Sequence, residues 1–438
     1  MKKRVLIVAF DFPPQGGTGA IRVTKFAKYL PEFGWQPVVV ASDTLWNPDE
    51  SLARDVADVP VYRVGWPRWM SKLRPQQPSL SHKPGEAPLT RQKETSLRSK
   101  LTTIAREWIF PDPNVFWVAG TIQQCRNVLM EENIAAILTT SPPHSVQLVG
   151  YFLKRRFPHI PWIADLRDLW SQSHLVVGKK LPYRINYFLE KRCLKTANRT
   201  LVVTEGIRQL TLEKFSRDVI SETKLITLTN GYDPADMAIL PAAQPHERFT
   251  LTFTGSLYEV RSQTEFIPAL EELMADRKLC DQIQLRLVGF IPPSIQRQMQ
   301  RLQELGVGIV RPPVSRQEAL AEMAQADVLL LLEADILELR LNHSNKLFEY
   351  LAVGKPILAI VPNGEAARLI REENAGIVVH PNDREGIKKA ILKLYENFKH
   401  HVEMPLPNPD KYARYQRRNL CRSLACILDQ CVAEVEKR

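Results

Sequence analysis

Two residues in the run HSNKLFEYLAVGKPILAIVPNGE, at 343–365, have the types and spacing to bind a nucleotide. Lys346 and Glu349 lie three residues apart, on one face of a helix that Ser344 or Asn345 can cap. A cation beside a helix N-terminus can neutralise a diphosphate, and a carboxylate can accept hydrogen bonds from two ribose hydroxyls. The alternative is that Lys346 and Glu349 form only a salt bridge along the helix.

A second candidate for phosphate binding follows the β-rich run 250–254. Gly255 begins a turn there, and Arg261 offers the planar fork of donors that suits a diphosphate. One exposed arginine would mean little alone. Together with Lys346, it predicts that two cations meet the same phosphates.

A glycine-containing loop, PPQGGTGAIR at 13–22, follows the first apolar run. Gly16 and Gly17 let backbone N–H groups approach an anion at the start of the next helix. A dinucleotide fingerprint would need glycine where the chain has Arg22. We therefore expect a loop that binds phosphate or acceptor, with a purely structural turn as the alternative.

The run WIADLRDLW, at 162–170, carries charged residues beyond the end of an expected strand. A carboxylate of Asp165 or Asp168 can orient an acceptor hydroxyl or support positive charge that develops on a sugar ring. Arg167 lies between them. The alternatives are an ion pair between aspartate and arginine, or a helix N-cap.

The spacing of β-rich runs predicts the scaffold that positions these residues. Such runs alternate with helical patterns at 5–10, 37–42, 135–139, 162–165 and 200–204, and again at 250–254, 284–288, 308–311, 328–332, 356–360 and 376–379. Strand, helix and strand at this spacing indicate parallel sheets with right-handed crossovers. We predict two Rossmann-like, doubly wound α/β domains that face each other across a cleft, with ligands beyond the carboxyl ends of the strands.

Composition suggests the domain boundaries. The turn-rich stretch after residue 229 places the first domain at 1–240 and the second at 241–410. Prolines, serines and bases interrupt the α/β rhythm at about 66–111, as expected of an insertion. Residues 411–438 have the pattern of a helix that packs back on the first domain.

The arrangement of charges fits transfer of a sugar from a nucleoside diphosphate. Breaking the sugar–diphosphate bond leaves negative charge on the leaving group and oxocarbenium character on the sugar. The chain contains no D-x-D triplet, so the usual carboxylate grip on a divalent metal is not offered. We expect Arg261, Lys346 and backbone amides to take that place, with no metal and no cofactor besides the donor substrate.

Positive charge is concentrated in one segment. The chain has a net charge of +11, and between Arg63 and Glu107 ten bases are accompanied by only three acids. Tryptophans at 66, 69, 108 and 117 accompany them, and this combination suits the interface of an anionic membrane. It predicts peripheral contact with the inner face of the plasma membrane through 63–117, with a solvated loop as the alternative. No nucleic-acid motif accompanies the charge, so we expect no nucleic-acid partner.

Bulk composition excludes several classes of protein. Hydrophobic residues make up 44% and charged residues 24%, which is ordinary for globular proteins and not for disordered or fibrous ones. The N-terminal apolar run ends at Asp11 without a signal-peptide cleavage site, and later apolar runs fall far short of the ~20 residues that span a membrane. The six cysteines are dispersed, and the last three are spread around a helix. A reduced, cytoplasmic compartment is the simple interpretation.

Taken in order, the motifs resemble those of the retaining glycosyltransferases of family 4, which have the GT-B fold. The resemblance spans nearly the whole chain. It comprises P-P-Q-G-G at 13–17, S-P-P-H-S at 141–145, W-I-A-D-L-R-D-L-W at 162–170, T-N-G-Y-D-P at 229–234, F-T-G-S-L-Y at 253–258, E-A-L-A-E-M-A-Q-A-D at 318–327 and K-L-F-E-Y-L-A-V-G-K-P at 346–356.

The resemblance implies a division of labour between the domains. The second domain binds a nucleoside-diphosphate sugar, and the first binds a lipid-linked or polysaccharide acceptor whose hydroxyl receives the sugar with retention of configuration. Arg261 stands where the family has its donor-phosphate lysine, Lys346 fits the K-L-x-E-Y-L-A-x-G-K-P variant, and Glu349 matches the ribose-binding glutamate. The implied role lies in the synthesis of cell-surface polysaccharide or glycolipid.

The predicted site therefore has three parts. We predict Asp168, Arg261 and Lys346 as catalytic residues. The predicted donor site consists of Gly255, Arg261, Ser344, Lys346, Leu347, Glu349, Gly364 and Glu365. The predicted acceptor or phosphate loop consists of Gly16, Gly17, Arg22, Asp165 and Arg167.

Three positions depart from the family pattern. Leu341 stands where the family has its first glutamate, Ser256 replaces its phosphate-binding arginine, and Arg167 replaces the histidine of a His-Asp pair. Two alternatives remain open at this point. One is a nucleotide-sugar epimerase or hydrolase of the same fold, and the other is a non-catalytic protein that binds sugar nucleotides.

Overall fold

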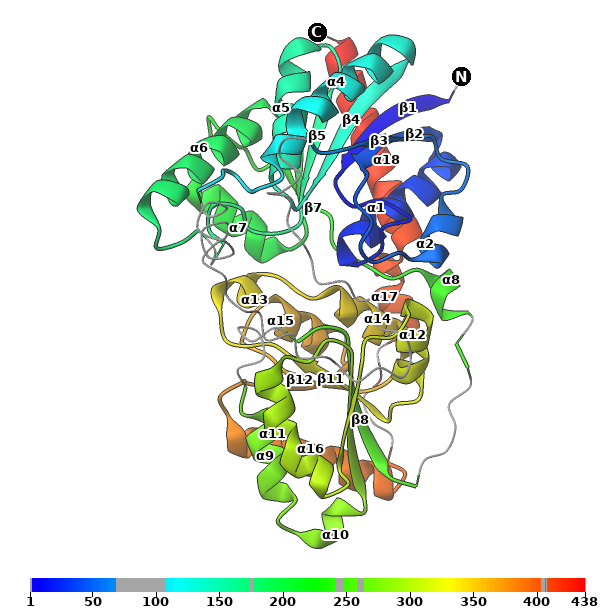
Figure 1. Cartoon of the computed structure of the whole chain (residues 1–438), viewed down its shortest axis with the longest axis vertical. Coiled ribbons are helices and arrows are strands. Elements are labelled where there is room, and N and C mark those ends of the chain that lie inside the picture. Colours follow the sequence, from blue (N-terminus) through cyan, green and yellow to red (C-terminus); the bar gives the residue numbers. More distant parts are fainter. Residues whose placement is uncertain are drawn as a thin grey trace. The chain divides into compact units, whose positions relative to one another are not determined.

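The computed structural model divides the chain into two compact units (Figure 1). It describes residues 2–67, 108–173, 176–238, 240–241, 247–257, 264–402, 406 and 408–437. Unit 1 consists of Met1–Thr229 and Arg417–Arg438, and unit 2 of Asn230–Gln416. Unit 2 begins before residue 240, where we expected the boundary. The reason is that the ring of Tyr232 packs against Tyr412 of unit 2, with ring centroids 5.6 Å apart.

Unit 1 is built on a parallel sheet. Within the described ranges this sheet has seven strands, in the order β3-β2-β1-β4-β5-β6-β7. Their bounds are β1 Lys3–Ala9, β2 Trp35–Ser42, β3 Val61–Val64, β4 Ile134–Ser141, β5 Trp162–Leu166, β6 Arg199–Val202 and β7 Leu225–Thr227. The central strands are continuous apolar runs because both of their faces are covered, as expected of parallel sheets.

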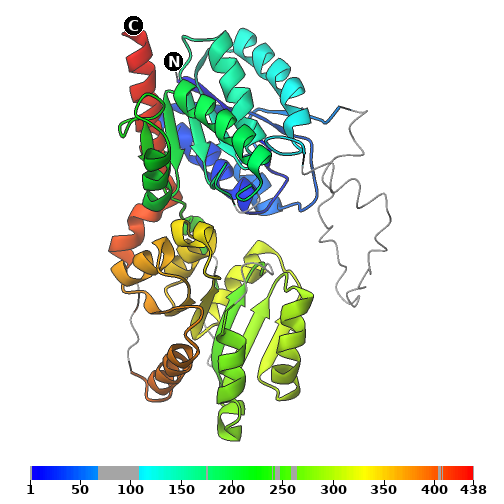
Figure 2. The same ribbon diagram turned by 90° about the vertical axis from the view of Figure 1, so that its left-hand side faces the viewer.

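Helices cover both faces of this sheet (Figures 1 and 2). Val5 and Ile7 of β1 share one core with residues of α1 and α18, so the alternating Leu6 and Val8 face the other side, where α4 and α5 pack. The helices of unit 1 are α1 Thr18–Tyr29, α2 Glu50–Asp55, α4 Val115–Glu131, α5 Ser145–Arg156, α6 Lys180–Thr196, α7 Glu205–Lys214 and α18 Arg417–Glu436, with a 3₁₀ turn at Leu30–Phe33.

The end of the chain returns to unit 1. α18 begins at Arg417 and buries Leu424 and Leu428 in the core that contains β1 and α1. The residues before Arg417 form the short α17, Pro409–Tyr412, and a 3₁₀ turn, Ala413–Tyr415, and they belong to unit 2. The helix that packs back is therefore shorter at its start than the expected 411–438.

Unit 2 is also built on a parallel sheet. In the part of unit 2 that the structure describes, the strand order is β10-β9-β8-β11-β12-β13. Its strands are β8 Phe249–Thr254, β9 Ile283–Val288, β10 Gly308–Arg311, β11 Val328–Leu332, β12 Ile357–Ile360 and β13 Gly376–Val379. The prediction of two doubly wound α/β domains is confirmed for each unit.

Two separate cores lie on the faces of this second sheet. Leu330 of β11 packs on the side of α9, α11 and α16, whereas its neighbours Leu329 and Leu331 pack on the side of α12, α14 and α15. The helices of unit 2 are α8 Pro234–Met237, α9 Phe266–Leu273, α10 Arg277–Cys280, α11 Pro293–Glu304, α12 Arg316–Ala324, α13 Leu337–Leu341, α14 Asn345–Val353, α15 Glu365–Glu372 and α16 Arg384–Lys399, followed by α17.

The burial of the cysteines gives a first testable prediction. Five of the six are buried and only Cys426 is exposed, and burial raises the pKa of Cys431 to about 11. A thiolate is the species that reacts with disulfide reagents, so buried, protonated thiols react slowly. We expect one thiol per native chain to react promptly with Ellman's reagent, and six after denaturation. Loss of the fast phase in Cys426→Ser is the control; prompt reaction of two or more native thiols would contradict this packing.

Candidate functional site

The predicted site residues follow strands at the carboxyl edge of their own sheet. In doubly wound sheets ligands bind beyond this edge, where the strand order reverses. The reversal lies between β1 and β4 in unit 1, and between β8 and β11 in unit 2. Gly255 directly follows β8, and Gly364 follows β12 by four residues. Lys346 lies in the connection between β11 and β12, after α13.

α14 places Lys346 in the first turn of a capped helix. Ser344 occupies the N-cap, and its hydroxyl accepts a hydrogen bond from the N–H of Lys346 at 3.3 Å. Gly354 ends the helix in the left-handed conformation, with φ of 74°. Leu347 is fully buried in the core beneath α14. Leu347 therefore anchors the helix, while the positive end of the helix dipole lies beside Lys346.

The side chain of Lys346 lies at the turn that follows β8. Its ammonium group is 4.0 Å from the centroid of the Phe253 ring. Gly255 has φ of 102°, and a Cβ built on it would be 3.0 Å from Cε of Lys346. A Cβ built on Gly289, after β9, would collide with the carbonyl oxygen of Gly255. A lysine, a helix N-terminus and a turn that admits only glycine thus meet where the strand order of unit 2 reverses.

Glu349, one turn further along α14, pairs with an arginine from α12. The carboxylate of Glu349 is 2.6 Å from Nη1 of Arg316, and Nη2 of Arg316 is 3.0 Å from Asp236. Burial alone would lower the pKa of Arg316, but the two carboxylates raise it above its usual value. Arg316 therefore fixes the orientation of the carboxylate that we predicted as a ribose ligand.

The start of α15 comes close to the end of α13. Gly364 is the N-cap of α15, and any side chain there would collide with the backbone of Arg340. Glu365, the first residue of α15, pairs with Arg368 at 2.7 Å. His343, just before α14, is buried against the edge of Phe348, and burial lowers its pKa to about 4. His343 is therefore neutral near pH 7.

Arg261 lies outside the described residues, so its part in the donor site stays a prediction. Two of the three departures from the family pattern, Ser256 and Leu341, lie in this half of the chain and are described. Ser256 is exposed directly after Gly255, and Leu341 is the last residue of α13.

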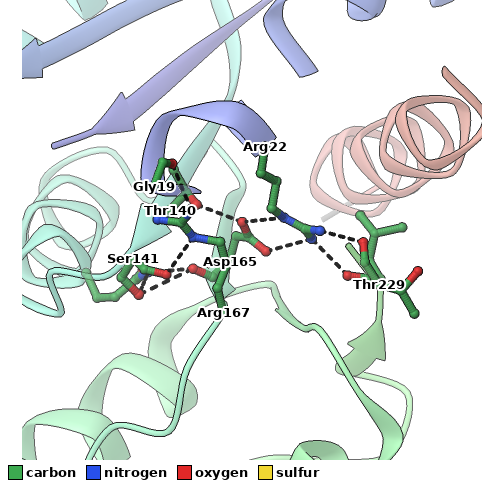
Figure 3. Close-up of polar contacts among 9 residues, drawn as sticks. Gly19, Arg22, Thr140, Ser141, Asp165, Arg167 and Thr229 are labelled. Atoms are coloured by element: carbon green, nitrogen blue, oxygen red, sulfur yellow. Dashed lines mark hydrogen bonds and ion pairs between the residues drawn. The ribbon is translucent and has the colours of Figure 1, made fainter. Parts of the chain in front are cut away.

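In unit 1 the predicted residues Arg22 and Asp165 are joined to each other (Figure 3). Two nitrogens of the Arg22 guanidinium donate to the two carboxylate oxygens of Asp165, at 3.1 and 3.0 Å. The same guanidinium donates to the carbonyl oxygens of Leu228 and Thr229, and Thr140 donates to Asp165 at 2.7 Å. Neither Arg22 nor Asp165 is exposed at all. Because these buried charges neutralise each other, the pairing favours the alternative of an ion pair for Asp165. Direct contact of Arg22 or Asp165 with an acceptor stays a prediction.

Arg167 is also engaged by the protein. Its guanidinium donates to the carbonyl oxygens of Ser141, Gly19 and Pro142, at 2.9, 2.8 and 3.2 Å (Figure 3). Burial lowers the pKa of Arg167, and Asp165 opposes that shift. Arg167 therefore ties the loop after β5 to the first turn of α1 and to the end of β4.

Asp168 is the exposed residue of the loop that begins after β5. The residues from Pro161 to Trp170 are otherwise buried. Its carboxylate thus stays the candidate for orienting an acceptor hydroxyl, and it stands on a loop whose neighbours are fixed.

His144 is a neighbour of this loop that we did not single out from the sequence. Nε2 of His144 lies 3.2 Å from the carbonyl oxygen of Leu169, so it must donate, and Nδ1 is left as the unprotonated nitrogen. The ring stacks on Trp170 with centroids 5.0 Å apart. Burial lowers the pKa of His144, against the opposing charges of Asp112 and Asp168. The available signal was its place in S-P-P-H-S, directly after an expected strand.

The loop after β1 is held by its own chain. The N–H of Gly16 donates to the carbonyl oxygen of Asn47 at 2.7 Å. Gly17, with φ of 91°, is the N-cap of α1. The amide of Gly16 is thus not offered to an anion, which favours the structural alternative for this glycine.

The basic segment 63–117 lies mostly outside the described residues. Of its tryptophans that are described, Trp66 and Trp117 are buried and Trp108 is 60% exposed. The indole of Trp117 donates to the carbonyl oxygen of Val64 at 2.9 Å. Trp66 and Trp117 are therefore packed within unit 1 and do not face a membrane. No helix in the described ranges is long and apolar enough to cross one.

The residues that the structure describes contain no group of three or more His, Cys, Asp or Glu side chains arranged to hold a metal ion. Charged groups described at the unit 2 edge include Lys346, Glu349 with Arg316, and Glu365 with Arg368.

Two family models match the chain, one in each unit. Residues 17–223 match the model described as glycosyl transferase 4-like domain, and residues 248–397 match the model described as glycosyl transferases group 1. A comparison with curated proteins finds no match.

Solved structures of similar fold match nearly the full length of the chain. Sucrose-phosphate synthase from Thermosynechococcus elongatus has a TM-score of 0.59 at 14% identity, over 99% of this chain and 98% of that chain. HepE from Anabaena, in complex with UDP-glucose, has a TM-score of 0.55 at 14% identity, over 99% of this chain and 98% of that chain. UDP-GlcNAc 2-epimerase from Methanocaldococcus jannaschii has a TM-score of 0.56 at 13% identity, over 98% of this chain and 99% of that chain. Identities this low show a common GT-B fold.

Proposed function

We propose that this chain, which carries the two domains of a GT-B glycosyltransferase, transfers a sugar from a nucleoside-diphosphate sugar to a hydroxyl acceptor. In this proposal transfer retains the anomeric configuration and needs no metal ion. The acceptor is lipid-linked or a growing polysaccharide, and the product belongs to the cell surface. Unit 2 binds the donor and unit 1 the acceptor.

The placement of Lys346 is the observation that supports this proposal most strongly. Its ammonium, the N-terminus of α14 and the turn at Gly255 converge where the strand order of unit 2 reverses. Fixed positive charge there meets the diphosphate of a donor, and the Glu349 carboxylate, held by Arg316, lies one turn away for the ribose. HepE, of the same fold, was solved with UDP-glucose, which makes a UDP-sugar the first donor to test.

The proposed reaction exchanges one bond at the anomeric carbon for another. The bond from that carbon to the diphosphate oxygen breaks, and the acceptor oxygen bonds to the same carbon on the same face. The acceptor proton passes to the departing phosphate oxygen. Lys346, Arg261 and the N-terminus of α14 stabilise the diphosphate, while Asp168 orients the acceptor or supports the positive sugar ring.

A donor screen followed by a transfer assay tests the proposal. A ligand at a hundred times its Kd stabilises the native state by about 2.7 kcal/mol, so a panel of UDP-, GDP- and dTDP-sugars should reveal the donor as a rise in melting temperature. Release of nucleoside diphosphate must then depend on acceptor and persist in EDTA, and NMR of the product must show the donor's anomeric configuration. Inversion, or activity lost in EDTA and restored by a divalent metal, would remove that part of the proposal.

An epimerase is the second candidate, because a UDP-GlcNAc 2-epimerase shares the fold. Such an enzyme converts its donor with no acceptor present. Incubating the chain with the donor alone therefore separates the two functions. Formation of an equilibrium mixture of two epimeric nucleotide sugars without any acceptor would favour the epimerase.

Gly255→Ala is expected to weaken binding of UDP by about tenfold. The new Cβ would lie 3.0 Å from Cε of Lys346, on a backbone with φ of 102°. Gly306→Ala is the matched control in the same unit, because Gly306 has φ of 71° but no atom within 4 Å of the added Cβ. Calorimetry should show weaker binding for Gly255→Ala only; equal effects would mean that backbone strain, and not contact with Lys346, is responsible.

A further inference from the structure

α5 and α6 lie side by side in unit 1 (Figures 1 and 2). Both helices expose large apolar side chains. Phe152 of α5 is 47% exposed, and Leu181 and Phe188 of α6 are each 50% exposed. Half-exposed side chains of this size are costly to leave in water, at about 25 cal/mol per Å² of apolar surface. Several of them on one surface indicate a contact with a partner.

Contacts between neighbouring side chains join them into one surface. The ring of Phe152 lies 5.2 Å from that of Tyr151, and Arg192 of α6 donates to the Tyr151 hydroxyl at 3.2 Å. The guanidinium of Arg192 lies over the ring of Phe188, at 4.5 Å. Further along α6, residues 181, 184, 188, 192 and 195 recur at helical spacing and are all exposed. We call this surface, formed by Phe152, Arg155, Leu181, Arg184, Phe188 and Arg192, the α5–α6 face.

The charge of this face has one sign. Arg155, Arg156, Lys179, Lys180, Arg184, Arg192 and Lys195 are exposed on or beside the two helices. The sequence of α5 contains no acid, and the single acid of α6, Glu190, is buried against Lys214 at 2.7 Å. The exposed acid Asp218 lies 3.8 Å from Lys195, at the edge of the face. Cations and apolar side chains therefore alternate here with no carboxylate between them.

We propose that the α5–α6 face docks unit 1 on an anionic lipid surface. Apolar side chains that enter the headgroup region, surrounded by Lys and Arg, are what binds a peripheral protein to such a surface. A polynucleotide would use the cations but would leave the aliphatic Leu181 unburied, so lipid fits the combination better. The docking site differs from the segment 63–117, whose tryptophans at 66 and 117 are buried. The inference does not depend on the sugar-transfer reaction.

The position of α6 gives this docking a use. α6 follows the loop that carries the exposed Asp168 along the chain. A bilayer held against the start of α6 would bring lipid-linked hydroxyl acceptors near the carboxyl edge of the unit 1 sheet. Docking through the α5–α6 face would therefore bring the proposed lipid-linked acceptors close to unit 1.

Vesicle co-sedimentation of the full chain tests the proposal. We expect binding to vesicles of phosphatidylcholine with phosphatidylglycerol, weak binding to phosphatidylcholine alone, and a loss at high salt. The double variant Arg184→Glu with Arg192→Glu should lower the partition coefficient about 30-fold or more. Its control, Arg297→Glu with Arg301→Glu on exposed positions of α11, changes the net charge equally and should have little effect.

A second pair of variants isolates the apolar contribution. Phe188→Ser should lower partitioning about tenfold, whereas Met130→Ser, at a position that is 73% exposed on α4, should not. No binding to anionic vesicles, equal binding to neutral ones, equal loss in the α11 control, or no effect of Phe188→Ser would overturn lipid docking. The last result would indicate a purely electrostatic contact, such as one with a polynucleotide.

Donor binding, measured on the same variants, keeps the two proposals distinguishable. The α5–α6 variants should keep the melting temperature of the wild type and its rise with UDP-sugar. Vesicle binding without any rise in melting temperature on addition of UDP-sugar would contradict the proposed function alone. A donor-induced rise without vesicle binding would sink the docking face alone.

Discussion

Replacing Lys346 by alanine is expected to lower kcat/KM for sugar transfer about 100- to 1000-fold, the loss typical when one preorganised donor to a developing negative charge is removed. The ammonium lies over Phe253, beside the turn at Gly255 and in the first turn of α14. As the sugar–diphosphate bond breaks, negative charge grows on the leaving group at this position. Acceptor-dependent release of nucleoside diphosphate measures the effect, and binding of UDP should weaken as well.

Two further variants separate the charge of Lys346 from its packing. Lys346→Met keeps an aliphatic stem over Phe253 but removes the charge, so it should lose as much activity as Lys346→Ala. Lys389→Ala removes an exposed lysine from α16 of the same unit and should leave activity unchanged. If Lys346→Met is nearly as active as the wild type, the ammonium does not stabilise the leaving group.

The fold could be predicted because its signal is local. The run at 5–10 corresponds to β1, Lys3–Ala9, and the run at 328–332 coincides with β11. Each strand of these parallel sheets is an apolar run that ends at turn residues, and that pattern is visible within ten residues of sequence. The spread of the last three cysteines around a helix was equally local, and Cys426 is the exposed one of the three.

The candidate site could be predicted only where its parts are close in sequence. Ser344, Lys346 and Gly354 belong to a single helix, and its caps follow from residue types. The partner of Glu349 is Arg316, from a different helix, and no local sequence pattern predicts that pair. Composition also shows which segment of the chain is charged, but not which side chains share one surface in the fold. The cations of α5 and α6 were therefore not recognised as one surface.

The loop around Asp168 shows the same limit. The sequence offered an ion pair between aspartate and arginine as the alternative for Asp165, without identifying the arginine. The structure pairs Asp165 with Arg22, 143 positions away, and uses Arg167 to bind three carbonyl oxygens. The sequence alone does not distinguish charged residues that pair with each other in the fold from charged residues that bind a ligand.

Asp165→Asn is therefore expected to destabilise unit 1 by about 3–5 kcal/mol, because removing one member of a buried ion pair leaves the other charge buried and uncompensated. Arg22 and Asp165 have no exposed surface, and two nitrogens of the guanidinium donate to the carboxylate at 3.1 and 3.0 Å. All eight tryptophans of the chain lie between residues 35 and 170, so intrinsic fluorescence during urea unfolding reports on unit 1 without a contribution from unit 2. The midpoint of that transition should fall while its slope is kept.

A matched pair on the surface of the same unit provides the control. Lys3 and Asp429 are 2.8 Å apart, but their side chains are 48% and 49% exposed, so Asp429→Asn should cost less than about 1 kcal/mol. The double variant Arg22→Met with Asp165→Leu should recover part of the loss, since it leaves no unpaired charge, although Thr140 and the carbonyl oxygens of Leu228 and Thr229 lose their partners. If Asp165→Asn costs no more stability than Asp429→Asn, the buried pair does not stabilise unit 1, and contact with an acceptor becomes the favoured role of Arg22 and Asp165.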